Sequence, residues 1–392
     1  MMLESAIIDE VELYEVEIPF KEPFEISGGV SHTRKSLIIL LKSDGVVGYG
    51  ESAPFEFPFY SPETLDSVRN MLISYFFPMI VGRKVNSIEE LNEILNRNVR
   101  GNNFAKAGVE TAYWDLIARK NAIPLKELLR WKMEQIGVPS EYTASRGYVE
   151  SGISIGIPVD RDLGKLREAI ERALEDGYKR VKVKIKPGWD IEPLKISREI
   201  LGYDFPLWTD ANGAYTLDHV DLFLEMDRYE CLFHEQPLHV QDYLGNLELA
   251  NRIKTPICLD ESLKSELIAR QVLKLNISRI WNLKIQRVGG LLEALKIYKI
   301  AVENQVKLWG GTMPETGLGA SFILCFASFA GFVYPSDVEP SSRWFEDGRD
   351  IVDLRMQDGR IKVPSDPGIG EISEDRIVRF GKKICTMRGD TK

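Results

Sequence analysis

Five charged residues recur at nearly constant spacing in the second half of the chain. Lys184, Asp210, Glu235, Asp260 and Lys284 are separated by 26, 25, 25 and 24 residues. Carboxylates bind divalent cations, and both carboxylates and amines move protons in enzymes. Random surface charge would not keep a period, so the spacing predicts that one repeated structural unit carries all five residues.

Each of the five lies near the end of a short β-rich run. The runs are GISIGI (152–157), RVKVKI (180–185), PLWTD (206–210), CLFHEQ (231–236), PICLDE (256–261), RIWNLKI (279–285), VKLWGG (306–311) and GFVYPS (331–336). Helical patterns fill the intervals, and repeated β–α units of this kind predict a parallel sheet that eight strands close into a barrel. A doubly wound sheet is the alternative, but it would be expected to carry a Gly-rich fingerprint after its first strand, and the sequence has none there.

The three carboxylates predict a metal site. The carboxyl ends of barrel strands meet at one mouth, where three anions would repel one another unless a cation lies between them. Oxygen ligands without His or Cys suit Mg²⁺, or Mn²⁺, better than zinc. An ion-paired interior would need a basic partner for each acid, and only Lys184 and Lys284 stand at equivalent strand ends. We therefore expect Asp210, Glu235 and Asp260 to bind the ion.

The two lysines predict proton transfer. A lysine pKa of about 10.4 must fall toward 7 to 8 for base catalysis, and both the ion and Lys182 would lower it for Lys184. We expect abstraction of the α-proton of a carboxylate substrate to give a metal-stabilised enediolate. Reprotonation from the opposite face inverts the centre, whereas loss of a β-leaving group is an elimination. A Schiff-base aldolase that uses Lys284 is the alternative from another class.

The strand RVKVKI should present its two faces in the reverse of the usual sense. In a barrel covered by helices, Val181, Val183 and Ile185 would pack outward, and the alternating lysines would face the interior. Lys186 lies toward the mouth with no role assigned. His234 precedes Glu235 and should therefore point out of the interior, without a catalytic role.

Composition narrows the class of partner. The net charge is −9, the pI is about 5.3, and no basic block occurs, which argues against nucleic acid and favours a small molecule. Four scattered cysteines and an acidic start without a signal sequence favour the cytoplasm. The uncharged stretch 316–336 is nearly long enough to span a bilayer, but its glycines and serines predict a buried helix followed by a strand.

The chain divides into three predicted parts. Residues 1–125 read as an α+β domain, 126–356 as the catalytic barrel, and 357–392 as a segment that packs back on the first domain. A helix is expected within NNFAKAGVETAYWDLIARK (102–120). A Gly-rich loop at 28–32 and an aromatic, Pro-rich loop at 53–63 are expected to cover the site.

Several motifs in order resemble the enolase superfamily, specifically its muconate-lactonizing subgroup. They are GYGESAPF, AKAGVETAYWDL, KVKIKPGWD, TDANGAY, HEQPL, CLDES and NLKIQRVGG. KIKPGWD, DANGAY and WGGTMPETGLG most resemble the o-succinylbenzoate synthase and N-succinylamino acid racemase family. The resemblance implies a (β/α)7β TIM-like barrel with an α+β capping domain, a Mg²⁺-dependent lyase or isomerase, a role in menaquinone synthesis for the lyase, and a homo-oligomer, dimeric or of higher even number.

The same resemblance implies roles for individual residues. Lys184 would be the base on one face, and Lys284 the opposite acid or base, or a cation near the enolate. The spacing from Lys284 to Arg287 resembles racemising members. The positions expected to line the substrate pocket are Ser154, Asn212, Met313 and Pro314. Gln286 and Thr312 depart from the family pattern and leave the substrate open, with dipeptide epimerase or muconate-type cycloisomerase as the alternative.

Overall fold

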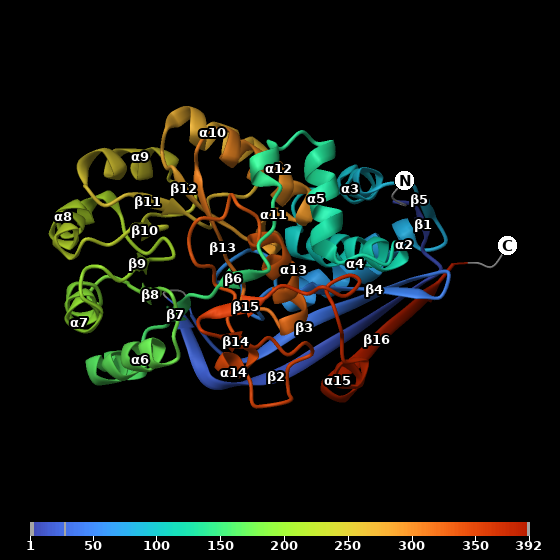
Figure 1. Cartoon of the computed structure of the whole chain (residues 1–392), viewed down its shortest axis with the longest axis horizontal. Coiled ribbons are helices and arrows are strands. Elements are labelled where there is room, and N and C mark those ends of the chain that lie inside the picture. The colour runs from blue at the N-terminus through green and yellow to red at the C-terminus, as the bar shows by residue number, and fades with distance from the viewer. Residues whose placement is uncertain (1–3, 27–28, 390–392) are drawn as a thin grey trace.

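The computed structural model describes residues 4–26 and 29–389. A curled parallel sheet with helices around it occupies one side of the molecule, and a long antiparallel sheet lies on the other (Figure 1). No helix in these residues is long and apolar enough to cross a membrane.

Seven strands form the parallel sheet, in the order of the chain and in consecutive register. They are β7 (Ile153–Ile155), β8 (Val181–Lys184), β9 (Leu207–Asp210), β10 (His234–Glu235), β11 (Ile257–Leu259), β12 (Ile280–Leu283) and β13 (Lys307–Gly310). Each coincides with one predicted β-rich run, so the structure confirms a mixed α/β fold built on a curled parallel sheet.

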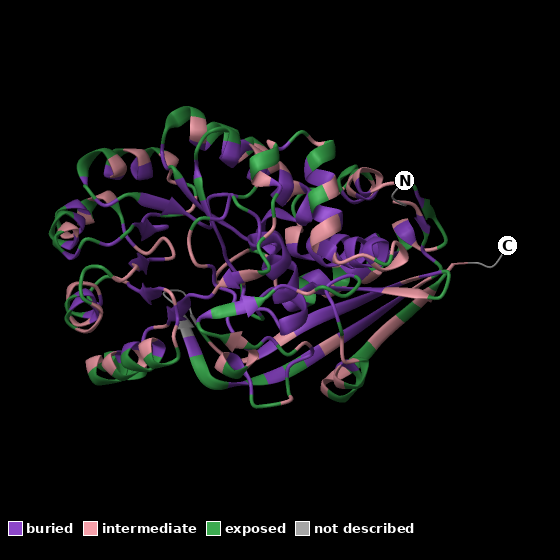
Figure 2. Cartoon of the chain, in the orientation of Figure 1, coloured by how far each residue is buried: buried purple, intermediate pink, exposed green. Residues whose placement is uncertain are grey.

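Helices of this part cover the outer side of the sheet. They are α6 (Leu163–Glu175), α7 (Ile191–Leu201), α8 (Val220–Met226), α9 (Tyr243–Arg252), α10 (Glu266–Leu275), α12 (Leu291–Glu303) and α13 (Gly317–Ala327). The short helix α11 (Ile285–Val288) follows β12 directly and is fully buried. In Figure 2 the strands are buried and the solvent side of α6 to α10 is exposed, as expected for helices with one apolar face. The uncharged stretch begins with α13, whose residues are all buried, as predicted.

The expected eighth strand, residues 331–336, does not form, and the barrel is not closed by a regular strand. Only isolated bridges occur there, Leu308 with Phe332 and Ser151 with Ser336. Pro335 has no N–H to donate to a ladder, and the backbone turns between the two bridges. The prediction of a strand at this position was wrong because of these local breaks.

A four-stranded antiparallel sheet forms the second layer, in the order β16-β2-β3-β4. Its strands are β2 (Glu10–Ile26), β3 (Gly29–Ser43), β4 (Val46–Ser52) and β16 (Gly381–Arg388). The Gly-rich loop expected at 28–32 is mostly strand, because Gly29–Ser43 pairs with β2; residues 27 and 28 lie outside the described residues.

Helix α4 (Asn103–Lys120), the helix predicted within 102–120, packs directly on β4. Glycines permit this close approach. A Cβ atom on Gly50 would lie 2.2 Å from the carbonyl oxygen of Gly108, and one on Gly48 would lie 2.4 Å from that of Ala112. The other helices of this layer are α1 (Leu65–Met71), α2 (Phe77–Ile80), α3 (Ile88–Asn96) and α5 (Leu125–Gln135), with a π-helix at Leu72–Phe76.

Short elements complete the fold. Strands β6 (Tyr148–Glu150), β15 (Arg360–Lys362) and β14 (Met356–Gln357) form a small antiparallel sheet, and β1 (Ala6–Ile7) pairs with β5 (Lys84–Val85). Helix α14 (Ser341–Trp344) follows the irregular eighth segment, and α15 (Glu374–Phe380) precedes β16.

Candidate active site

The three predicted metal ligands lie at the carboxyl ends of neighbouring strands. Asp210 ends β9, Glu235 ends β10 in direct register with it, and Asp260 follows β11. All three are at most 1% exposed. Parallel register therefore places the acids as the constant spacing predicts.

Lysines of β8 face these acids from the inside of the sheet. Lys184 Nζ lies 2.5 Å from Asp210 Oδ2 and donates to Asn212 Oδ1 at 2.9 Å. Lys182 Nζ lies 2.7 Å from Asp337 Oδ2 and 3.2 Å from Glu235 Oε2. Val181, Val183 and Ile185 are buried in the apolar core on the other face. The lysine face of this strand is thus the inner one.

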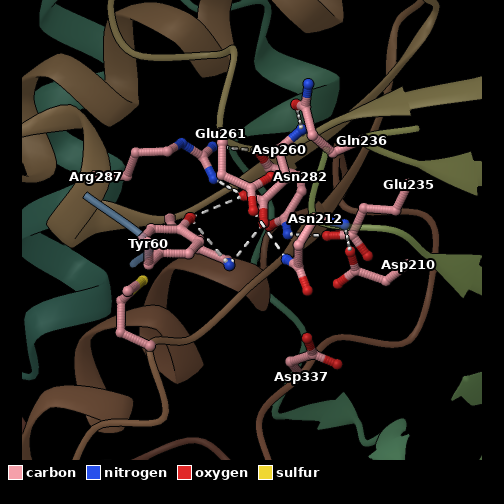
Figure 3. Close-up of polar contacts among 12 residues, drawn as sticks. Tyr60, Asp210, Asn212, Glu235, Gln236, Asp260, Glu261, Asn282, Arg287 and Asp337 are labelled. Carbon is pink, nitrogen blue, oxygen red and sulfur yellow. Dashed lines mark hydrogen bonds and ion pairs between the residues drawn. The ribbon is translucent and has the colours of Figure 1, made fainter. Parts of the chain in front are cut away.

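A second cluster surrounds Asp260 on the far side of the pocket (Figure 3). Lys284 Nζ lies 2.8 Å from Asp260 Oδ2, and Arg287 donates to Asp260 Oδ1. The hydroxyl of Tyr60, from the loop after β4, lies 3.2 Å from Lys284 Nζ and donates to Asp260 Oδ1 at 3.3 Å. Through this cluster, the end of β12 contacts the Pro-rich loop that was predicted to cover the site.

Burial and charge oppose each other in these pairs. Burial raises the pKa of Asp210, but Lys184 and Lys182 outweigh it and hold that pKa below its usual range. For Glu235, burial and the nearby Asp210 carboxylate outweigh the surrounding lysines and raise the pKa. Burial lowers the pKa of Lys284, yet surrounding groups, Tyr60 and Glu261 foremost, raise it overall.

The acids do not form a metal-ligand group in this structure. Within residues 4–26 and 29–389, no three His, Cys, Asp or Glu side chains are arranged to hold an ion. Each acid instead faces a cation: Lys184 for Asp210, Lys182 for Glu235, and Lys284 with Arg287 for Asp260. The expectation that the acids lack enough basic partners was wrong, because Lys182 and Arg287 also turn inward.

One pocket brings the two predicted catalytic lysines together. Lys184 and Lys284 line it from β8 and β12, with Lys182 and all four residues expected to contact substrate, Ser154, Asn212, Met313 and Pro314. Phe24, Phe55 and Trp344 add an apolar wall. Of the predicted site residues outside this lining, Asp210, Glu235 and Asp260 each pair with a lysine that lines it, and Arg287 pairs with Asp260.

Some residues of the site were missed from the sequence. Asn282 donates to Glu235 Oε1 at 2.7 Å, and strand alternation with Lys284 could have revealed it. Gln236 Oε1 accepts from the backbone N–H groups of Asp260 and Ser262 and so fixes the loop after β11. Asp337, the partner of Lys182, follows the eighth segment and carries no motif (Figure 3).

His234 lies outside this cluster. Its ring packs against the ring of Phe223 of α8, with the two ring centroids 5.3 Å apart. Its Nδ1 lies 2.7 Å from Thr209 Oγ1. Burial lowers the pKa of His234 to about 4. The side chain thus belongs to the contact between sheet and helices.

Known protein families and relatives match nearly the whole length of this chain. The family described as "Mandelate racemase / muconate lactonizing enzyme, N-terminal domain" matches residues 8–130, and "Enolase C-terminal domain-like" matches 165–376. An o-succinylbenzoate synthase of Bacillus subtilis is 36% identical to this chain, and the alignment covers 96% of this chain and 97% of that relative. An N-succinylamino acid racemase of Thermus thermophilus is 38% identical, with coverage of 93% and 94%.

The fold is shared with solved structures. A member of the enolase superfamily from Listeria innocua superposes with a TM-score of 0.87 at 32% identity, over 97% of this chain and 98% of that chain. Sequence and fold agree over nearly the whole length, so the chain belongs to the enolase superfamily, in its mandelate racemase and muconate lactonizing enzyme family.

Proposed function

We propose that this chain is an enzyme that removes the α-proton of a carboxylate substrate. The observation that carries the proposal is the pair Lys184 and Lys284, which line one pocket from the second and sixth strands of the curled sheet. When two amines lie on opposite sides of a bound substrate, one can accept a proton and the other can donate one. In this role Lys182 and Arg287 position the acids that hold the two lysines.

The substrate class follows from the relatives. Those named o-succinylbenzoate synthase or N-succinylamino acid racemase are 32–38% identical over nearly the full chain. We infer that this chain carries out one or both of these reactions. In racemisation, one lysine removes the α-proton and the other protonates the opposite face. In dehydration, Lys184 removes the α-proton and returns it to the β-hydroxyl as the C–O bond breaks, so that water leaves, while Lys284 stays a cation beside the enolate.

Dipeptide epimerisation and muconate-type cycloisomerisation remain the runner-up. A relative from Pseudomonas putida that is 25% identical is named chloromuconate cycloisomerase, and a solved structure of similar fold is named dipeptide epimerase. Turnover of N-succinylamino acids or the cyclohexadiene precursor, against turnover of dipeptides or muconate, separates the two. The alternative from another class, a Schiff-base aldolase that uses Lys284, is tested by borohydride trapping of substrate on Lys284; trapping, with activity that survives EDTA, would favour the aldolase.

The donor set fits a divalent ion, Mg²⁺ or Mn²⁺. Asp210, Glu235 and Asp260 offer only oxygen ligands, and the buried Glu235 Oε2 accepts no hydrogen bond. We propose that these three residues hold the ion, which would take over the charge compensation now provided by Lys184 and Lys284. When bound, the ion supplies positive charge beside the substrate carboxylate, which acidifies the α-carbon. Ser154, Asn212, Met313 and Pro314 would contact the substrate.

We also propose a division into domains, a class of partner and a cellular form for this chain. We infer that 126–356 forms a TIM-like catalytic barrel, that 1–125 caps it, and that 357–392 returns to the cap, as the pairing of β16 with β2 favours. The partner is a small carboxylate rather than nucleic acid. A cytoplasmic homo-oligomer, dimeric or of higher even number, is the expected form.

The test is solvent-deuterium exchange at the substrate α-carbon, followed by NMR for an N-succinylamino acid. Lys184→Ala should abolish exchange from one enantiomer and Lys284→Ala from the other. Lys186→Ala, two residues beyond the end of β8, is the control and should leave exchange near the wild-type rate. Undiminished exchange in both active-site variants would refute the assigned roles.

A further inference from the structure

The pocket lining includes polar groups that the two-lysine chemistry does not use. Glu339, just before α14, lines the pocket together with Ser154 of β7. The Glu339 side chain is 2% exposed. Its Oε1 accepts the backbone N–H of Ser154 at 2.9 Å, but its Oε2 has no hydrogen-bond partner. Ser154 Oγ is also buried without a partner.

Two unpartnered oxygens in one pocket wall are costly. A buried acceptor without a donor loses the free energy of its former hydrogen bonds to water. Burial raises the pKa of Glu339 to about 7, which agrees with a carboxylate that is poorly compensated. A ligand group that donates a hydrogen bond would remove this cost.

The other charged groups of the lining already have partners. Among the described residues there, Asp337 is paired with Arg180 and Lys182, and the three lysines are donors only. The lysines therefore serve acceptor oxygens of a substrate, whereas Glu339 Oε2 serves a donor.

We propose that Glu339 is a specificity-determining residue that accepts a hydrogen bond from an N–H group of the substrate, amide or ammonium, with Ser154 as its neighbour in this subsite. The proposal rests on the proposed α-proton chemistry and narrows its substrate to nitrogen-bearing carboxylates such as N-acylamino acids. The cyclohexadiene precursor of the dehydration carries no N–H. Phe24, Phe55 and Trp344 then contact the apolar part of the substrate.

The competing explanation is a purely structural ion pair. Arg343 Nε lies 3.7 Å from Glu339 Oε2, beyond hydrogen-bond range, and makes no other hydrogen bond. Its guanidinium lies over the ring of Trp344 at 4.9 Å. If Glu339 serves only to hold Arg343, substitution of either residue should affect every substrate alike.

A matched pair of substrates tests this. N-succinyl-phenylalanine and the ester in which oxygen replaces its N–H differ only in the donor. In Glu339→Gln, kcat/KM for α-proton exchange should fall about 10- to 100-fold for the amide and less than about 3-fold for the ester, as expected for a hydrogen bond to a charged group. Alanyl-phenylalanine is the third arm, and a loss confined to it identifies an ammonium donor. An equal loss for all three substrates overturns the proposal.

Two further measurements keep the outcome decisive. Arg343→Gln should retain the preference for the amide, and a lost preference would assign Glu339 a structural role; Glu339→Asp serves if Glu339→Gln does not fold. Calorimetric binding to Lys184→Ala/Lys284→Ala, with and without Glu339→Gln, does not depend on turnover. If the amide binds more tightly than the ester in a Glu339-dependent way, but the wild type catalyses no exchange, only the proposed function is refuted. If the amide and the ester bind equally well, the subsite is refuted.

Discussion

At the scale of single residues, buried charge is balanced side chain by side chain. Lys184, Lys182 and Lys284 each contact a fully buried carboxylate, and Arg287 shares Asp260 with Lys284. A buried charge is tolerated only when it is paired and hydrogen-bonded. The interior is therefore compatible with a folded state whether or not a divalent ion is bound.

This balance predicts the effect of metal removal. Treatment with EDTA should abolish α-proton exchange and leave the far-UV circular dichroism unchanged, because lysines compensate the acids. Added Mg²⁺ should restore exchange and raise the free energy of unfolding by about 2.7 kcal/mol at a hundredfold excess over Kd. Unfolding upon chelation would contradict the ion-paired interior, and exchange that survives chelation would contradict the metal proposal.

Asp350 makes a pH-dependent contribution to stability. Its Oδ1 accepts the N–H groups of Gly317, at the start of α13, and of Ile351, and burial raises its pKa to about 7. Between pH ~4 and ~7 the folded state binds a proton that the unfolded chain has lost, so stability should fall by up to about 4 kcal/mol as pH rises through this window.

The isosteric Asp350→Asn variant isolates this effect, since its Oδ1 keeps both hydrogen bonds. Urea unfolding at pH 5 and pH 8 should show that the variant gains stability relative to wild type at the higher pH. A difference between the two proteins that does not change with pH would rule out the raised pKa.

At the scale of elements, period and alternation predicted the positions of the seven strands and the inner face of β8. The constant spacing also predicted that Lys184, Asp210, Glu235, Asp260 and Lys284 gather at one end of the sheet. The eighth segment could not be predicted in this way, because Pro335 and the turn near it break the ladder without disturbing the β-rich composition. Tyr60 and Asp337 depend on loop conformation, which short-range patterns do not encode.

The contact between β4 and α4 predicts a large cost for one methyl group. A Cβ atom in Gly50→Ala would lie within 2.8 Å of three atoms of α4, including backbone. We expect a loss of about 1–3 kcal/mol in the free energy of unfolding, as for overpacked cores. Gly147→Ala, which has no atom within 4 Å of the new Cβ, is the control and should change stability little in urea denaturation. Equal stability of both variants would refute the close packing.

At the scale of the whole molecule, one guanidinium joins the antiparallel sheet to the loops at the pocket. Arg34 of β3 is 2% exposed and donates to the carbonyl oxygens of Pro54, in the loop after β4, and Met313, after β13. Its Nε also donates to Ser36 Oγ. The two loops that contact the pocket are thus fixed to a single side chain of the sheet.

Arg34→Met keeps an unbranched apolar stem but leaves these buried carbonyls without a donor. We expect KM for the substrate to rise about 10-fold, with a smaller fall in kcat, because loss of donors to buried acceptors costs about 1–3 kcal/mol and the lysines are unchanged. Steady-state kinetics measures both constants. A fall in kcat at constant KM would show that Arg34 acts on the catalytic groups instead.

The pairing of β16 with β2 also bears on how the protein is made. Glu10 and Arg388 pair across 378 positions of the chain. During synthesis the edge of β2 stays open until β16 leaves the ribosome, since no other strand pairs with that edge among the described residues. An open strand edge invites pairing with other chains. When it pairs, the last described strand therefore closes this open edge and ends the exposure to aggregation, as well as completing the sheet.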